Sequence, residues 1–278
     1  MKISILGDSI STYTDYNPIG YSVFYDDLNQ RKNGINSVDD TWWFQLINYF
    51  NLELCSNNSY SGSQVAKENI YSTNNINRLY FLQKDGVVPD IIIIYIGCND
   101  YFRGTKIKNS RFNVDVNCFY DAYNMMLKNI KRLFPNSTIV CGTLMKSYIK
   151  DYDNFKFPEN YCGIPFNNYN DTIKKVAKKN GCFVIDLDSQ NIKYETLDGT
   201  HPTKLGHAEI CKAWVQGLLK EPNILHNIRN KNNKTHSWYC EFYYIIIYFF
   251  NSLPPIYNLY PFRLILLFVV SALVNDLI

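Results

Sequence analysis

The chain has 278 residues, of which 46% are hydrophobic and 16% aromatic, enough to bury a sizeable core in one large domain or in one domain with an appendage. Its net charge of +3 is small and its lysines and arginines are scattered, so we expect no nucleic-acid partner. Four histidines without an H-E-x-x-H motif and eight cysteines without a C-x-x-C pair give no zinc-ligand spacing, and we expect no metal site.

The N-terminus leads from Met1 directly into the apolar run at residues 3–6, without the charged segment, apolar stretch and cleavage site of a signal peptide. Several cysteines lie at the ends of apolar runs, where a free cysteine behaves as a small buried hydrophobe. Both observations favour a reducing compartment, and we expect a cytoplasmic protein with unpaired cysteines.

Short apolar runs alternate with longer runs of helical periodicity from Met1 to about Glu221. The short runs predict strands at 2–6, 52–56, 90–96, 137–142 and 182–186. The longer runs predict helices at 42–50, 116–134 and 205–218, the first capped by the Asp39-Asp40 pair and the second stopped by Pro135. This alternation predicts an α/β protein, a three-layer αβα sandwich with about five parallel strands.

Two regions break the alternation. Residues 11–37 are rich in Tyr, Asn, Asp and Gly without a clear period, which indicates either a loop that shapes a pocket or an ordered surface loop without a ligand role. Residues 223–278 contain a basic stretch and then apolar runs within 242–274, and neither run reaches the roughly 18–20 residues of a spanning helix. We therefore predict a domain at 1–222 and a tail that either attaches to a membrane or has another, unknown role.

Polar residues follow the predicted strands at their carboxyl ends, the edge of an open α/β sheet where ligands bind. Ser9 follows the first strand, Gly62 the second and Asn99 the third, while Asp198 and His201 follow the fifth. A serine needs a base near neutral pH, and His201 can be that base, with Asp198 holding its tautomer. The backbone N–H groups of Ser9 and Gly62 and the amide of Asn99 are the kinds of donor that an oxyanion needs.

The segments GDSIS, NNSYSG, GCND and DGTHP, in this order, resemble the four signature blocks of the SGNH (GDSL-type) hydrolase superfamily. Each block alone is a weak signal, whereas the ordered set from residue 1 to about 220 is specific. The resemblance implies a flavodoxin-like fold, Ser9 as nucleophile, His201 as base oriented by Asp198, and Ser9, Gly62 and Asn99 as the oxyanion hole. It also implies ester or thioester hydrolysis without a metal or organic cofactor. The family pattern does not require the tail after residue 222.

Each site residue also has a simpler interpretation. Ser9 can cap a helix, Gly62 can serve a turn, Asn99 can bond loop backbone, and Asp198 and His201 can be turn residues. Taken together, the five residues favour a catalytic site.

Four neighbouring residues receive structural assignments. We expect His207 to lie in the core, Asp8 and Asp100 to fix loops as hydrogen-bond acceptors, and Cys98 to pack as a small buried residue.

The sequence therefore predicts a serine esterase acting on a small-molecule ester, with short-acyl (acetyl) esters of a carbohydrate as the favoured substrates. A lysophospholipase or thioesterase stays open, as does a catalytically silent module that binds a sugar or a lipid. The Trp42-Trp43 pair and the tyrosines of residues 11–37 can stack on a sugar, although aromatic residues at helical spacing are more often core. Nothing in the sequence indicates an oligomeric state.

Overall fold

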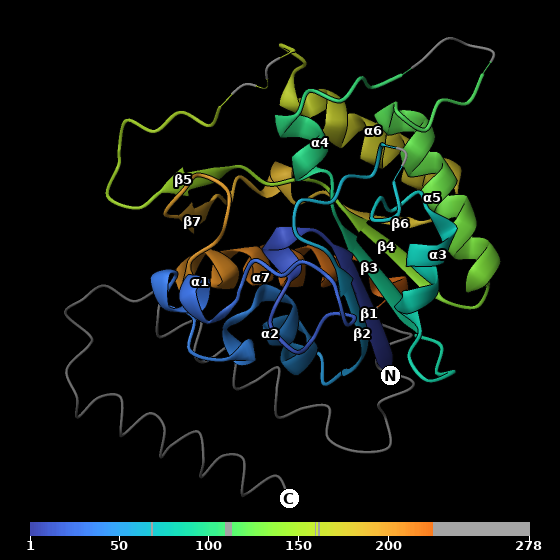
Figure 1. Ribbon diagram of the computed structural model, residues 1–278, viewed down its shortest axis with the longest axis horizontal. Helices are drawn as coiled ribbons and strands as arrows, with labels where there is room; N and C mark the ends of the chain where they lie inside the picture. Colours follow the sequence, from blue (N-terminus) through green and yellow to red (C-terminus); the bar gives the residue numbers. More distant parts are fainter. Residues whose placement is uncertain (68, 109–112, 159, 161, 225–278) are drawn as a thin grey trace, which may run out of the picture. The chain divides into compact units, whose positions relative to one another are not determined.

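Five parallel strands form the central sheet, in the order β2-β1-β3-β4-β6. The computed structural model describes residues 1–224 except 68, 109–112, 159 and 161. The strands are β1 (Lys2–Gly7), β2 (Glu53–Ser59), β3 (Ile91–Tyr95), β4 (Thr138–Gly142) and β6 (Phe183–Ile185). The prediction of a three-layer αβα sandwich with about five parallel strands is confirmed (Figure 1).

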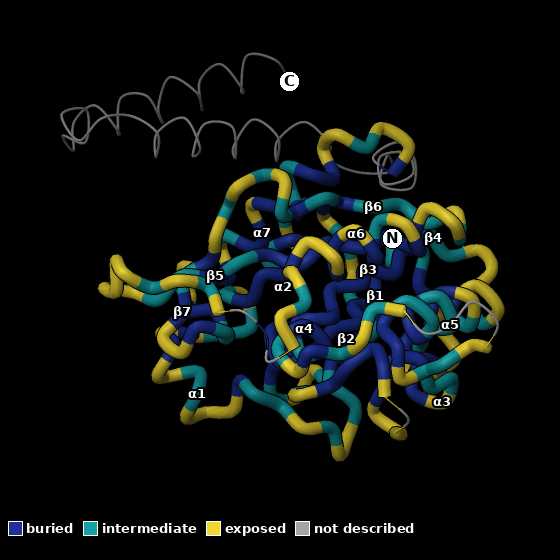
Figure 2. The backbone as a smooth tube through the Cα atoms, turned by 90° about the horizontal axis from the view of Figure 1, so that it is seen from above, coloured by how far each residue is buried: buried dark blue, intermediate teal, exposed yellow. Residues whose placement is uncertain are grey.

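Helices cover both faces of this sheet (Figure 1). They are α1 (Asp27–Lys32), α2 (Trp42–Tyr49), α3 (Ile76–Leu79), α4 (Cys98–Phe102), α5 (Phe119–Leu133), α6 (Phe166–Lys179) and α7 (Lys204–Leu218). Alternate residues of β3 point into different layers, because successive side chains of a strand lie on opposite faces. Ile91 and Ile93 pack with α2 and α7, whereas Ile92 and Ile94 pack with α5 and α6. The sheet is therefore buried on both sides, and the exposed backbone lies mainly in the connections (Figure 2).

Two strands and one long helix were not predicted. The strands β5 (Ser147–Ile149) and β7 (Tyr194–Thr196) pair in parallel as a second, two-stranded sheet. With three residues each, they are too short to show a period in the sequence. The helix α6 was missed because its buried face includes polar residues, among them Asn170, whose side chain bonds both backbone groups of Leu144.

The start of α2 differs from the prediction. Thr41 is the N-cap residue, and Asp39 and Asp40 lie in the preceding short 3-10 helix, η2 (Val38–Asp40). Asp40 instead accepts a hydrogen bond from the N–H of Asn36 and forms an ion pair of 2.8 Å with Lys204. The carboxylate therefore links this turn to the start of α7 rather than capping α2.

Asn17, in the segment 11–37, binds the edge strand β2. The side-chain amide of Asn17 donates to the carbonyl groups of Asn57 (3.1 Å) and Ser59 (3.0 Å), both on β2. An edge strand presents unpaired backbone groups, and these two hydrogen bonds satisfy part of that edge. The segment is thus ordered and includes α1, which its composition did not indicate.

The predicted tail at 223–278 lies outside the described residues, apart from its first two positions. Its role and the domain boundary at residue 222 therefore stay predictions. Within the described part of the chain, no helix combines the length and apolar character needed to cross a membrane.

Gly217 allows α7 to lie directly against β6. A Cβ atom at this position would overlap Cγ2 of Ile185, a buried residue of β6. Alanine has the higher helix propensity, by about 1 kcal/mol, but overpacking a rigid core costs about 1–3 kcal/mol. We expect Gly217→Ala to lower the free energy of unfolding, measured by guanidinium denaturation.

The same substitution in an Ile185→Ala background tests the cause. Removing the side chain that the new methyl group meets should make Gly217→Ala less destabilising there, because the two residues are in contact. Equal losses in both backgrounds would contradict the steric explanation.

Candidate active site

A tight turn at the carboxyl end of β1 holds Ser9. The strand ends at Gly7, and the short 3-10 helix η1 (Ser9–Ser11) follows. The Asp8 side chain caps η1 by accepting a hydrogen bond from the N–H of Ile10 (3.1 Å). A Cβ atom at Gly7 would lie 2.6 Å from Oγ of Ser11, so only glycine allows the chain to turn back this closely. The turn fixes Ser9 at the edge where ligands bind in such sheets.

A second turn holds His201, and it follows β7 of the two-stranded sheet rather than the fifth strand of the central sheet, β6, as predicted. Oδ1 of Asp198 accepts hydrogen bonds from the backbone N–H groups of Thr200 and His201, both at 2.8 Å. The hydroxyl group of Thr196 accepts from the N–H of Gly199 at 3.0 Å, and Gly199 has a φ of +84°, which favours glycine. Asp198 thus shapes its own turn with one oxygen and keeps the other for a further partner.

Ser9, His201 and Asp198 form one line of hydrogen bonds. Nε2 of His201 lies 2.9 Å from Oγ of Ser9, and Nδ1 lies 2.7 Å from Oδ2 of Asp198. A carboxylate only accepts hydrogen bonds, so Nδ1 carries the proton of a neutral ring and Nε2 accepts from the serine hydroxyl. Burial alone would raise the pKa of Asp198, but the hydrogen bonds from His201 and Thr200 lower it to about 2. Asp198 is therefore a carboxylate at neutral pH.

Gly62 and Asn99 belong to two loops that are bonded to each other. The side-chain amide of Asn99, at the start of α4, donates to the carbonyl group of Ser63 (3.0 Å). Gly62 is exposed and has a φ of +77°. Tyr60 ties this loop to the turn that carries Ser9, because its N–H donates to the carbonyl group of Gly7 (3.3 Å). The loops after β1, β2 and β3 thus meet at one edge, as expected for parallel strands.

Asp8 and Asp100 are buried carboxyl groups that fix these loops, and the prediction of that role is confirmed. Asp100 accepts hydrogen bonds from the N–H groups of Val65 (2.8 Å) and Ala66 (2.9 Å). Burial raises the pKa of Asp100 to about 7 and that of Asp8 to about 6, although the backbone hydrogen bonds favour the charged forms. Both groups are neutral for part of the ordinary pH range.

Arg78 also holds the turn that carries Ser9, and sequence reasoning missed it. It is 2% exposed, and its guanidinium group donates to the carbonyl groups of Gly7 (2.9 Å), Asn58 (3.2 Å) and Tyr71. Burial lowers the pKa of Arg78 to about 10. It therefore fixes the carboxyl ends of β1 and β2 together. A single arginine between polar and apolar residues gives no sequence signal for such a position.

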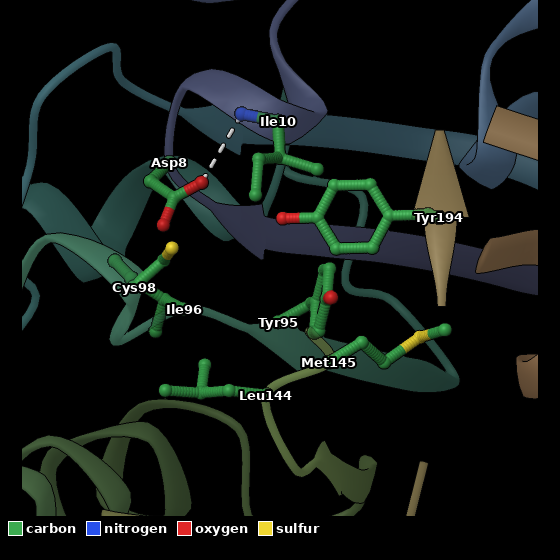
Figure 3. A pocket seen from close by; sticks show the side chains of 8 residues that line it. All are labelled: Asp8, Ile10, Tyr95, Ile96, Cys98, Leu144, Met145 and Tyr194. Carbon is green, nitrogen blue, oxygen red and sulfur yellow. Dashed lines mark hydrogen bonds between the residues drawn. The ribbon is translucent and has the colours of Figure 1, made fainter. Parts of the chain in front are cut away.

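A small cavity lies beside the turn that carries Ser9 (Figure 3). Its lining is mainly apolar and consists of Asp8, Ile10, Tyr95, Ile96, Cys98, Leu144, Met145 and Tyr194. It has room for about one water molecule, too little for a substrate. Burial raises the pKa of the Cys98 thiol well above its ordinary value, which agrees with its predicted role as a packed residue. Among the described residues, no group of three or more His, Cys, Asp or Glu side chains is arranged to hold a metal ion.

His207, Trp42 and Trp43 are core residues. His207 is fully buried, Nδ1 of its ring accepts from the N–H of Trp42 (3.2 Å), and burial lowers its pKa to about 3, so its predicted structural role is confirmed. The two tryptophan side chains are 0% exposed, and Trp42 stacks on Trp214. The idea that Trp42 and Trp43 stack on a sugar is therefore wrong, because the helical spacing points both rings into the core.

Comparisons with known proteins agree with the fold and with the family that the sequence resembles. A family model described as GDSL-like lipase/acylhydrolase matches residues 1–218. A protein described as a GDSL-like lipase from Bacteroides ovatus is 25% identical, with a TM-score of 0.60 over 79% of this chain and 98% of that one. A similarly described protein from Bacteroides uniformis is also 25% identical, with a TM-score of 0.60 over 79% and 95% of the two chains.

A protein from Lactobacillus plantarum shares the fold at 20% identity, with a TM-score of 0.57 over 79% of this chain and 96% of that one. No curated protein matches the chain.

Asp100 should make stability depend on pH. Folding raises its pKa from the ordinary 3.8 to about 7, so between these values the folded protein keeps a proton that the unfolded chain has lost. Asp100 should therefore lower the free energy of unfolding as pH rises from about 4 to 7, by up to about 1.4 kcal/mol per pH unit. Asp8 adds a decrease up to about pH 6, whereas His207, whose pKa burial lowers from 6.5 to about 3, adds an increase of similar size up to about pH 6.5. These contributions sum to the slope of stability against pH. Chemical denaturation at a series of pH values measures this slope.

Asp100→Asn should remove the Asp100 part of the slope even though it lowers stability overall, since asparagine cannot accept from two N–H groups in the same way. Asn in place of the exposed Asp153 is the matched control. An unchanged slope in Asp100→Asn would contradict the assignment.

Proposed function

Because this chain belongs to the GDSL-like lipase/acylhydrolase family, and is thus a serine hydrolase that cleaves esters, we propose that Ser9 is its nucleophile, His201 its general base and Asp198 the carboxylate that orients His201. The observation that carries the proposal is the pair of hydrogen bonds on His201, 2.9 Å to Ser9 and 2.7 Å to Asp198. These are the contacts that an activated serine needs.

In the first half of the reaction, Oγ of Ser9 attacks the ester carbonyl carbon while its proton moves to Nε2 of His201. The imidazolium that forms lies against Asp198, whose carboxylate is charged at neutral pH because its pKa is about 2. When the intermediate collapses, the bond to the leaving alkoxide breaks, and His201 gives the alkoxide its proton. A water molecule then repeats the sequence on the acyl-enzyme, which releases the acid and restores Ser9.

The proposed oxyanion hole consists of the N–H groups of Ser9 and Gly62 and the side-chain amide of Asn99. An amide NH2 group has two donors, and Asn99 uses one of them on Ser63. That bond fixes the orientation of the amide and leaves its second N–H for the developing negative charge. Preorganised donors of this kind stabilise the transition state without reorganisation.

For the substrate, we propose a short-acyl ester of a carbohydrate. Support comes from aromatic rings beside the Gly62 loop: Tyr60 stacks on Tyr71 at 4.1 Å, and Tyr21 lies edge-on to Tyr60 at 5.3 Å. Tyr71 is 36% exposed, so part of this residue is accessible to a sugar. Tyr21 belongs to the tyrosine-rich segment 11–37. The role that Trp42 and Trp43 cannot fill is thus available to these tyrosines.

Substitutions at the site should produce losses that differ by role. Ser9→Ala removes the nucleophile, so ester turnover should fall to the assay background while the fold is kept, and adding Asp198→Asn should cost little more because both act on one transition state. Asn99→Ala should lower kcat by roughly 10²–10³ with little change in KM. Steady-state kinetics on the purified variants measures these losses. Turnover that survives Ser9→Ala would contradict the proposed nucleophile.

The substrate class is tested with a screen of p-nitrophenyl esters of increasing chain length beside acetylated sugars. We expect the highest kcat/KM for acetyl and other short acyl groups, and release of acetate from the sugars. A rate that rises steadily with chain length would favour a lysophospholipase or thioesterase instead. Sugar or lipid binding without hydrolysis of any ester would favour a silent binding module.

A further inference from the structure

The ring of Phe24 lies flat on the imidazole of His201. The two ring centroids are 3.4 Å apart and the planes differ by 7°. Phe24 belongs to the segment between η1 and α1, far in sequence from His201. No sequence block of the family resemblance includes it, so its contact with the histidine emerges only in three dimensions.

Hydrogen bonds connect the segment around Phe24 to the turn that carries Ser9. The N–H of Phe24 donates to Oγ1 of Thr12 (2.9 Å), and that hydroxyl donates to the carbonyl group of Ser9 (3.0 Å). On its other side, the carbonyl group of Phe24 accepts from the side-chain amide of Asn29 in α1 (2.8 Å). The backbone that carries the ring is therefore fixed relative to Ser9.

Tyr25 makes a parallel contact one residue further on. Its hydroxyl group donates to the carbonyl group of Pro202 (2.7 Å), the residue after His201, and its side chain is fully buried. The ring of Tyr25 lies edge-on to Phe24 at 5.0 Å and beside His207 at 4.9 Å. Phe24 thus contacts His201 through its ring face, and Tyr25 binds the next residue, Pro202, through a hydrogen bond. Both contacts hold the histidine turn, residues 198–202.

The histidine turn needs such support because it is partly open to solvent. The side chain of Asp198 is 49% exposed, whereas that of His201 is 17% exposed. The hydrogen bonds at the two nitrogens act within the ring plane, and a flat partner on one face restricts rotation of the ring out of that plane about its Cβ–Cγ bond. The face of a phenyl ring also attracts a cation, which favours the imidazolium that the reaction forms.

We propose that Phe24 is a positioning residue of the hydrolase, which holds the imidazole of His201 in the orientation that deprotonates Ser9. The inference rests on the proposed roles of Ser9 and His201. In this role Phe24 acts through His201 and takes no part in the bond changes. A purely structural role would predict that its loss changes stability but not the reactivity of a folded protein.

The test measures how fast a fluorophosphonate probe labels Ser9 in the full chain, followed by intact-mass spectrometry, since this reaction needs no knowledge of the natural substrate. We expect Phe24→Leu and Phe24→Met to lower the limiting labelling rate by about tenfold or more, with the probe's half-saturation concentration unchanged. Phe24→Tyr, which keeps the ring face, should stay within about twofold of the wild type. Phe44→Leu is the matched control, because that half-buried ring contacts Tyr16 and Trp43 instead.

A second comparison separates positioning from stability. In a His201→Ala background, Phe24→Leu should cause no further loss of labelling, because the ring acts through a group that is already absent. Only variants whose circular dichroism and melting temperature match those of their parent are compared, and either Leu or Met at position 24 suffices.

The outcomes distinguish the two levels of inference. Absence of labelling at Ser9 in the wild type would overturn the proposed nucleophile. Labelling of the wild type at Ser9, together with an equal rate in a folded Phe24→Leu or Phe24→Met variant, would overturn the role of Phe24 alone. The role of Phe24 would also be overturned if Phe24→Leu lowered the labelling rate in the His201→Ala background as much as it does in the wild type.

Discussion

The contact between Oγ of Ser9 and Nε2 of His201 joins residues 192 positions apart, and most of the site holds the two ends of that contact in place. One end is fixed by β1, which lies in the sheet between β2 and β3, so that the loops of Gly62 and Asn99 flank the Ser9 turn. The other end is held by the separate two-stranded sheet of β5 and β7, and the turn with Asp198 and His201 follows β7. The 2.9 Å contact between Ser9 and His201 therefore depends on the order of β2, β1 and β3 in the central sheet and on the second sheet.

Buried polar side chains, rather than apolar packing, fix the backbone conformation of the loops at the site. Arg78 holds the carbonyl groups of Gly7 and Asn58, and Asp100 holds two N–H groups of the loop after Gly62. Burying such groups is costly, as the raised pKa of Asp100 and the lowered pKa of Arg78 indicate. Turns have little side-chain core of their own, so directional hydrogen bonds are the means by which their backbone reaches a single position. Burying these polar side chains therefore costs stability, but it fixes the backbone of the turns in one position.

The imidazole of His201 contacts a carboxylate, a hydroxyl group and an aromatic ring. Asp198 and Ser9 define the plane of its hydrogen bonds, and Phe24 covers one of its faces. Phe24 and Asn17 both come from residues 11–37, which bind the edge of β2 as well as the histidine turn. One irregular segment thus closes the sheet edge and completes the site, which explains how a stretch without periodicity is nevertheless ordered.

The sequence by itself determined the parallel sandwich, because buried strands such as IIIIY and long amphipathic helices have periods that are visible locally. It also determined that Ser9, Gly62 and Asn99 follow the first three strands of the sheet, since each lies in a short block after an apolar run. Asp198 and His201 were expected after the fifth strand, and the structure places them after β7 of the second sheet instead. Local signals were insufficient for α6, whose buried face includes Asn170, and for the three-residue strands β5 and β7. They also did not decide whether Trp42 and Trp43 face a ligand or the core. Only the tertiary structure decided the positions of Arg78 and Phe24, because their roles consist of contacts with backbone and rings distant in sequence, and such contacts leave no local pattern.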